Sequence, residues 1–362
     1  MAETNNNTNW QRLAQSIKTA GQELGFQQVG ITDTDLSATE PQLQQWLDEG
    51  RHGTMEWMAR HGSKRCRPEE LVPGTVRIIT VRMDYLPPDC AQMQAVLAEP
   101  QRAYVSRYAL GRDYHKLMRK RLQKLADMII SAAGPVGYRV FVDSAPVMEK
   151  ALAQKAGLGW IGKHTNLLNK DAGSWFFLGE IYTDMPLPVD KTGMNHCGDC
   201  TTCIDACPTN AITAPYLLDA RLCISYLTIE HEGTIPVQLR PFIGNRIYGC
   251  DDCQLYCPWN RFANFTYETD FHPRHELDDI DLLELFSWDR ATFLSKTEGS
   301  AIRRIGHERW LRNIAVALGN TTSNRERVID ALLLARVSAT TLVQEHICLL
   351  YTSDAADDDT IV

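Results

Sequence analysis

Eight of the eleven cysteines of this chain lie between Cys197 and Cys257. A first run with the spacing C-x2-C-x2-C-x3-C-P contains Cys197, Cys200, Cys203 and Cys207. A second run repeats the pattern without its first member and contains Cys250, Cys253 and Cys257. Ile247 stands where the missing cysteine would be, and Cys223 lies between the runs. Eight thiols in so short a segment indicate that it folds around metal centres or is cross-linked by disulfides.

The first run has the bacterial ferredoxin spacing, in which three cysteines bind one [4Fe-4S] cluster and the fourth binds a second cluster. The second run lacks one ligand, and Cys223 is the only nearby cysteine that can supply it. Two sets of four follow. The first set is Cys197, Cys200, Cys203 and Cys257. The second set is Cys207, Cys223, Cys250 and Cys253. The sequence therefore predicts two [4Fe-4S] clusters.

Disulfides and zinc are the alternative uses of these cysteines. The polar start MAETNNNTNW carries no secretory signal, which argues against disulfides and leads us to expect a cytoplasmic protein. Structural zinc usually pairs two short C-x2-C knuckles, whereas a triplet followed by Cys-Pro suits a tetrahedral ion poorly. Cys66 and Cys90 lie far from both runs and are expected to be ordinary thiols.

Composition indicates a globular chain of two or three domains, with 44% hydrophobic and 23% charged residues among 362. No apolar stretch reaches the ~18 residues that a membrane-spanning helix needs, so no membrane association is expected. The net charge of −8 argues against indiscriminate binding of polyanions but allows local basic patches. We expect a monomer.

The pattern of apolar residues predicts an α+β fold. Helices are predicted over residues 11–26, 113–133, 146–156, 282–294, 300–319 and 324–337. Strands are predicted over residues 28–32, 75–85, 138–142 and 174–183. This alternation gives an α/β domain over residues 1–185, followed by a ferredoxin-like cluster module over 186–265 and a helical region over 266–347. The last helices suggest a truncated HEAT-like array, although two helix pairs are too few to establish a repeat.

Residues 348–362 abandon the helical period and are predicted to be a non-native tail, with a disordered acidic tail as the alternative. The glycine-rich segment over 157–163 follows a predicted helix rather than a strand, so it is a weak phosphate loop. Because glycine allows close backbone approach, that segment better suits a wrap around a large flat ligand.

Taken together, several segments resemble the epoxyqueuosine reductase family. They are YALGRDYH at Tyr108–His115, the stretch Phe141–Leu168, both cysteine runs, YGCDDCQLYCPWN at Tyr248–Asn260, and Glu298–Asn320. The likeness extends from near residue 10 to about Ile347 and includes the replacement of the missing cysteine by Cys223. It implies a cobalamin-dependent, tRNA-modifying oxidoreductase that reduces epoxyqueuosine to queuosine at the wobble position, using two [4Fe-4S] clusters and an external low-potential electron donor.

The resemblance also implies roles for individual residues. Asp143 matches the family's proposed proton donor, a role that needs a raised pKa at neutral pH. The alternative is that Asp143 only caps the following helix. Candidate contacts to the cobalamin, besides Asp143 itself, are Arg107, Gly162, Lys163, His164, Asn166, Leu167 and Ser225. His115 is not expected to bind cobalt, because the family lacks a lower ligand from the protein.

Two basic segments are candidates for RNA contact. Residues 111–124 carry six basic side chains against one acidic side chain, and residues 301–321 carry four against one. We assign phosphate contacts to the second segment, through Arg303, Arg304, Arg309 and Arg312. An ordinary solvated helix face is the alternative.

Two other functions remain open from the sequence. One is a corrinoid and iron–sulfur reductase of a small molecule, similar to reductive dehalogenases. The other is an iron–sulfur electron carrier with no chemistry of its own, which would bind no corrinoid and would tolerate replacement of Asp143.

Overall fold

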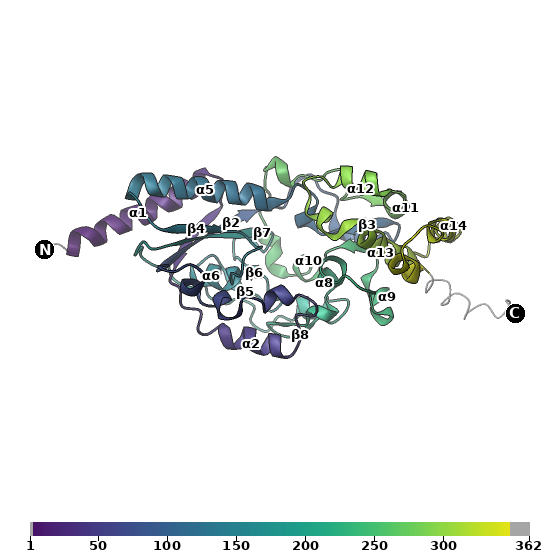
Figure 1. Cartoon of the computed structure of the whole chain (residues 1–362), viewed down its shortest axis with the longest axis horizontal. Helices are drawn as coiled ribbons and strands as arrows, with labels where there is room; N and C mark the ends of the chain where they lie inside the picture. The colour runs from purple at the N-terminus through teal and green to yellow at the C-terminus, as the bar shows by residue number, and fades with distance from the viewer. Residues whose placement is uncertain (1–2, 348–362) are drawn as a thin grey trace.

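The computed structural model describes residues 3–347, and its N-terminal half is built on a four-stranded antiparallel sheet (Figure 1). The strand order is β1 (Gln28–Thr32), β2 (Arg77–Asp84), β7 (Phe176–Thr183) and β4 (Tyr138–Phe141). All four lie in the segments predicted to be strands. Because every neighbouring pair is antiparallel, this half is α+β and contains no parallel βαβ unit within the sheet.

Helices cover both faces of this sheet. In Figure 1, α1 (Glu3–Glu23) and α5 (Tyr114–Ala133) lie on one face, and α2 (Glu40–Asp48) and α6 (Glu149–Lys155) lie on the other. The period of two along β2 explains this. Ile79, Val81 and Met83 pack with α1 and α5, whereas Ile78 packs with Leu152 of α6. The helix predicted over 113–133 is confirmed as α5, with Asp113 as its N-cap.

Ten further short helices and strands lie between residues 68 and 255, and some of them contain cysteines of the two runs. They are α3 (Pro68–Leu71), α4 (Met93–Ala98), β5 (Trp160–Ile161), β6 (Leu167–Leu168), α7 (Thr202–Asp205), β8 (Ile212–Ala214), β9 (Leu217–Leu218), α8 (Ile224–Ile229), α9 (Arg240–Ile243) and α10 (Asp252–Leu255). Within the described residues, no helix is long and apolar enough to span a membrane.

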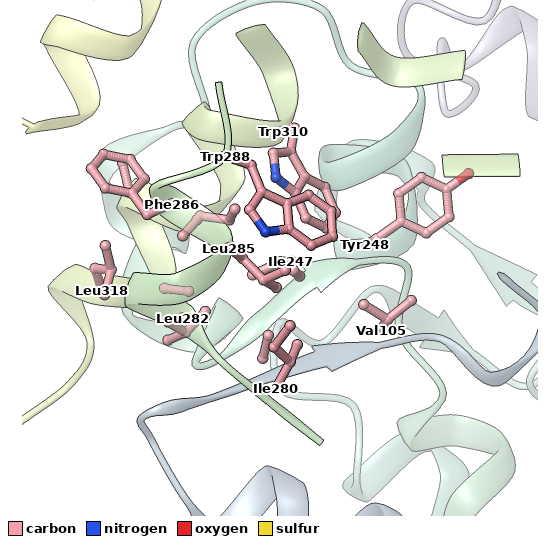
Figure 2. Close-up of a cluster of buried hydrophobic side chains, with 14 of the residues drawn as sticks. Val105, Ile247, Tyr248, Ile280, Leu282, Leu285, Phe286, Trp288, Trp310 and Leu318 are labelled. Atoms are coloured by element: carbon pink, nitrogen blue, oxygen red, sulfur yellow. The ribbon is translucent and has the colours of Figure 1, made fainter. Parts of the chain in front are cut away.

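A second sheet joins the three parts of the chain. β3 (Arg102–Val105) pairs in parallel with β10 (Arg246–Tyr248) and antiparallel with β11 (Ile280–Asp281). None of these three short strands was predicted. Figure 2 shows the core above them, where Trp288 and Trp310 pack over Ile247. The predicted boundaries near residues 185 and 265 therefore follow the cysteine pattern, while the apolar packing runs across them.

The C-terminal helices differ from the predicted ones in their breaks. The stretch predicted as one helix over 282–294 is α11 (Leu282–Phe286) and α12 (Arg290–Lys296), because Asp289 caps a new helix. The stretch over 300–319 begins as a 3-10 turn, Ala301–Ile305, and continues as α13 (Gly306–Gly319). Helix α14 (Arg325–Arg336) follows, the chain is helical again over residues 341–347, and the predicted tail lies outside the described residues. The HEAT-like architecture stays a prediction.

Candidate active site

The structure brings the first predicted set of cysteines together. Cys203 lies on α7. Its thiol is close enough to interact electrostatically with the other three members of the set, Cys197, Cys200 and Cys257. Burial and these three neighbours raise the pKa of the Cys203 thiol to about 11. Thiols that resist ionisation in this way need a positive centre to hold them as thiolates, which is what bound iron supplies.

The second predicted set also converges. Cys253 on α10 is electrostatically coupled to Cys223 and Cys207, and Cys250 is coupled to Cys223. Cys223 is the N-cap residue of α8, so the substitute ligand comes from a helix start between the two cysteine runs. Helices α7 and α10 contact one another and bring the two runs side by side.

Hydrogen bonds reach sulfur atoms of both sets. Trp160 donates from its indole to Cys197 Sγ at 3.4 Å, and the backbone N–H of Ala211 donates to Cys207 Sγ at 3.2 Å. The amide of Asn166 lies 3.9 Å from Cys253 Sγ. Hydrogen bonds to sulfur are among the features that set the potential of a cluster.

A cavity of about 410 Å³ adjoins the second set, because Cys223 is part of its wall. The start of α5, the turn after β4, α6, β7, α8 and the 3-10 turn Ala301–Ile305 enclose it. Cys200 of the first set is exposed at the protein surface. The two sets therefore lie in order between the surface and the cavity.

Several predicted site residues line this cavity and others do not. Those in its wall are Asp143, Asn166, Leu167, Ser225 and Arg304. Four predicted contacts to the cobalamin lie elsewhere: Arg107, Gly162, Lys163 and His164. Aromatic and aliphatic side chains form much of the remaining wall, among them Tyr85, Tyr108, Phe176, Phe177 and Leu178.

Two of the four residues outside the wall, Lys163 and Arg107, use their charge within the protein, and their role as cobalamin contacts stays a prediction. Lys163 donates from Nζ to the carbonyl oxygens of Gly198 and Cys200, at 2.7 and 2.9 Å, and so supports the first cysteine run. Arg107 is buried and donates to Cys90 Sγ at 3.2 Å. Neither side chain reaches the cavity wall.

The other two residues outside the wall belong to the β5–β6 hairpin. A Cβ at Gly162 would lie 2.7 Å from Leu168 Cδ1 and 3.1 Å from His164 Cε1, so side chains of the hairpin itself occupy the space next to this glycine. His164 is buried, and its Nδ1 accepts a hydrogen bond from the Asn166 N–H at 3.1 Å. Burial lowers the pKa of His164 to about 4, so the imidazole is neutral at pH 7.

Asp143 occupies a strained position in the cavity wall. Its φ of 39° lies in the left-handed region, which non-glycine residues rarely adopt and which often marks a functional site. Tyr114 donates from its hydroxyl to Asp143 Oδ2 at 2.7 Å, and His115 Nε2 lies 3.4 Å from the same oxygen. The other ring nitrogen of His115 lies 2.6 Å from Asp113 Oδ1.

These contacts place the proton beside Asp143 rather than on it. Although burial opposes ionisation, hydrogen bonds from His115 and Tyr114 lower the pKa of Asp143. Although burial also disfavours the imidazolium, Asp113 and Asp143 raise the pKa of His115 to about 9. The raised pKa that a donor role for Asp143 requires is therefore not a property of this residue in the structure.

The sequence analysis missed Glu149 and Lys150, which also line the cavity. Burial and then the charge of Asp143 raise the pKa of Glu149 to about 8. The position of Glu149 six residues after Asp143, at the predicted helix start, is the only signal of its role in the sequence.

The four arginines predicted to contact phosphate separate into two kinds. Arg303 and Arg304 are exposed, and Arg304 reaches the cavity wall and lies 3.6 Å from Glu230. Arg309 is partly buried and donates to the Ile229 carbonyl oxygen at 3.1 Å. Arg312 is fully buried and binds backbone carbonyl groups, so its prediction as a phosphate contact is wrong.

Two cysteine sets, one with a member exposed to solvent and one next to a cavity whose wall contains a carboxylate, define an iron–sulfur oxidoreductase. The family model described as epoxyqueuosine reductase QueG, DUF1730, matches residues 65–144. The model described as 4Fe-4S double cluster binding domain matches residues 196–260, which contain all eight cysteines.

Curated relatives agree with these matches over nearly the whole chain. The chain is 62% identical over 337 residues to the epoxyqueuosine reductase of Pseudomonas aeruginosa, covering 93% of both chains. It is 60% identical over 336 residues to that of Escherichia coli, covering 93% of this chain and 88% of the relative. The chain belongs to the epoxyqueuosine reductase family, as its sequence indicated, and binds two [4Fe-4S] clusters.

Solved structures of this family have the same fold. One is an epoxyqueuosine reductase with a tRNA-Tyr epoxyqueuosine-modified stem loop, with a TM-score of 0.85, 25% identity, and coverage of 94% of this chain and 89% of that one. Another, from Bacillus subtilis, has its catalytic aspartate loop swung out of the active site. It has a TM-score of 0.85 and 26% identity, with the same coverage.

Proposed function

We propose that this chain reduces epoxyqueuosine to queuosine in tRNA, with electrons passing through two [4Fe-4S] clusters to a cobalamin in the cavity. The observation that carries this proposal is the cavity wall, in which Cys223 of the second cysteine set and Asp143 both take part. The proposed second cluster and the ionisable side chain of Asp143 thus lie at the same cavity. The names of the relatives and the tRNA stem loop bound to one of them support the same substrate.

The cavity residues fit a corrinoid. Leu167, Phe176 and Leu178 offer apolar surface to a flat macrocycle, and Asn166 and Ser225 offer polar groups for its amide side chains. Asn166 is well placed, because its amide also approaches Cys253. When bound, the corrinoid supplies a low-valent metal that can donate electrons to a strained C–O bond.

Side chains in the cavity wall supply the protons that the reduction consumes. Removal of the epoxide oxygen as water consumes two electrons and two protons and leaves a carbon–carbon double bond. Asp143 is the proposed donor to the oxygen, and the His115 imidazolium beside it is the proton source that the structure offers. Tyr114 and His115 hold the Asp143 carboxylate, and Asp113 orients His115.

RNA binding is proposed at the side of the cavity that carries the 3-10 turn. Arg303 and Arg304 are exposed there, and Arg309 lies one turn further along the chain, so all three are near a common surface. Cationic side chains neutralise phosphates, and an unstacked base can enter a deep cavity. We further propose a cytoplasmic monomer whose external low-potential electron donor docks near the exposed Cys200.

The proposal is tested on protein reconstituted without air. We expect about eight irons and one cobalt per chain and conversion of epoxyqueuosine in a tRNA stem loop. Asp143→Asn is expected to lower kcat about 100-fold or more while iron and cobalt counts stay unchanged. Exposed Asp127→Asn on α5 is the control.

Three results would argue against the proposal. Failure to take up cobalt with a full iron complement would favour an electron carrier. Equal conversion of free nucleoside and tRNA would favour a small-molecule reductase. Full activity of Asp143→Asn would remove the donor role.

A further inference from the structure

Three carboxyl groups from three different elements lie in the cavity wall or next to it. Asp143 follows β4, Glu149 begins α6, and Glu180 lies in the middle of β7. The register of the sheet pairs Phe141 with Glu180, which places Glu180 next to the strand that leads to Asp143. Glu180 has no exposed surface, and neither of its carboxyl oxygens has a hydrogen-bond partner within the described residues.

Glu149 lies close to the backbone of Asp143. The Asp143 N–H is near enough to the Glu149 carboxyl group to favour its ionised form, at the residue whose φ of 39° marks a strained turn. Glu149 also forms part of the cavity wall. It is therefore connected to Asp143 on one side and to the reaction space on the other.

The charges around Glu149 do not favour its ionisation. From α6 itself it faces Lys150, from the turn after β4 it faces Asp143, from α5 it faces His115, and from β7 it faces Glu180. Three carboxyl groups thus share two cations, and of the three Glu180 is the one with no exposed surface. Burial and the neighbouring carboxyls raise the pKa of Glu180 well above its usual range. Like charges this close cannot all be ionised, and protons must stay on the cluster.

The reaction proposed above consumes two protons per turnover, and the His115–Asp143 pair supplies one of them. We propose that Glu149 is a positioning residue that holds the Asp143 turn through its contact with the Asp143 N–H and returns the second proton to the Asp143 carboxylate during each turnover. The proton moves from the Glu149 carboxyl to the Asp143 carboxylate, and from there to the oxygen that leaves as water. Solvent in the cavity then reprotonates Glu149, and the clusters supply both electrons. This inference rests on the proposed function.

Two substitutions of Glu149 distinguish its role in holding the Asp143 turn from its role in supplying a proton to Asp143. Glu149→Gln keeps an oxygen near the Asp143 N–H but has no proton to give, whereas Glu149→Ala loses both functions. We expect Glu149→Gln to lower kcat at least tenfold, with iron count and KM for the stem loop unchanged. The fall of the wild-type rate above about pH 8 should be absent in this variant. Glu23→Gln, on the exposed surface of α1, is the matched control.

The outcomes divide clearly. Loss of rate in both Glu149 variants supports proton supply. Wild-type rate and pH dependence in Glu149→Gln overturn it, even if Glu149→Ala is slow, because Glu149 would then only hold the turn.

An infrared titration of the reconstituted protein gives a readout that does not depend on turnover. A neutral carboxyl band that disappears with a midpoint near pH 8 in wild type, and is missing in Glu149→Gln, supports the proton store. Absence of such a band in wild type overturns it. If wild type shows the band but does not convert the stem loop, the proposed function fails while the proton store stands.

Discussion

Replacement of Arg312 by methionine tests whether this arginine stabilises the fold or binds RNA. Arg312 lies on α13 with no exposed surface. Its guanidinium donates to the carbonyl oxygens of Leu227, His231 and Gly233 at distances of 2.7, 2.7 and 2.8 Å. It also donates to Asn313 Oδ1. Methionine fills a similar volume without any of these donors.

The expected loss of stability follows from these bonds. A hydrogen bond to a charged group contributes about 1.5–3 kcal/mol, and a buried carbonyl left without a partner costs about 1–3 kcal/mol. Since such terms are not additive and the buried guanidinium no longer has to be desolvated, we expect a net loss of about 3–5 kcal/mol. With an unfolding entropy of about 2.1 cal/mol/K per residue, a chain of this size melts roughly 1.3 °C lower for each kcal/mol lost, so the melting temperature should fall by about 4–6 °C.

The assay pairs Arg312→Met with Arg303→Met, an exposed neighbour in the 3-10 turn. Both variants are melted without air and titrated with the tRNA stem loop at several salt concentrations. Arg303→Met should change stability by no more than about 0.5 kcal/mol but reduce the salt dependence of binding by about one phosphate contact. The reasoning is refuted if Arg312→Met melts like wild type and shows the reduced salt dependence instead.

Two further predictions concern Cys223, a proposed ligand of the cluster beside the cavity, and the carboxyl group of Glu149 in the cavity wall. Cys223→Ala should lower the iron content from about eight to about four per chain, whereas Cys90→Ala should retain it, and equal iron in both would exclude Cys223 as a ligand. The folded chain keeps a proton on Glu149 up to about pH 8, whereas the unfolded chain releases it near 4.5, so this group lowers stability progressively as the pH rises between these values. Glu149→Gln should therefore have a higher free energy of unfolding than wild type. The difference should grow from pH 5.5 to pH 9, up to about 5 kcal/mol, and a difference that does not depend on pH would contradict the raised pKa.

Local signals in the sequence predicted the parts of the molecule that depend on neighbouring residues. The strand at 28–32 and helix α5 follow from periodicity. The cysteine spacing predicted two sets that the structure brings together, because cluster ligands come at fixed separations. The second sheet was not predictable in this way. β3 has four residues, and its partner β10 lies far along the chain, so only tertiary packing selects that pairing.

Charge patterns predicted the RNA surface less well, because one basic segment contains side chains with different surroundings. Arg303 and Arg312 are nine positions apart, but α8 covers only Arg312 and supplies the Leu227 carbonyl oxygen that binds it. The same difficulty applies to the cavity. Lys163 follows a glycine-rich segment and looked like a ligand contact, but the first cysteine run supplies carbonyl oxygens for it. A buried cation is recognisable only when its partners from elsewhere in the chain are known.

The buried bonds of α13 also bear on how RNA binding and electron transfer are related. Arg312 and its neighbour Asn313 bind the carbonyl oxygens of Leu227 and Thr228 on α8, the helix whose N-cap is Cys223. The preceding turn of the same C-terminal segment carries Arg304 at the cavity wall. These bonds connect α13 to α8, so the proposed RNA surface and the second cysteine set are joined through packed helices. The proposed RNA surface and the proposed electron donor to the cavity therefore belong to one packed unit, and a substitution that loosens α13 is expected to disturb both together.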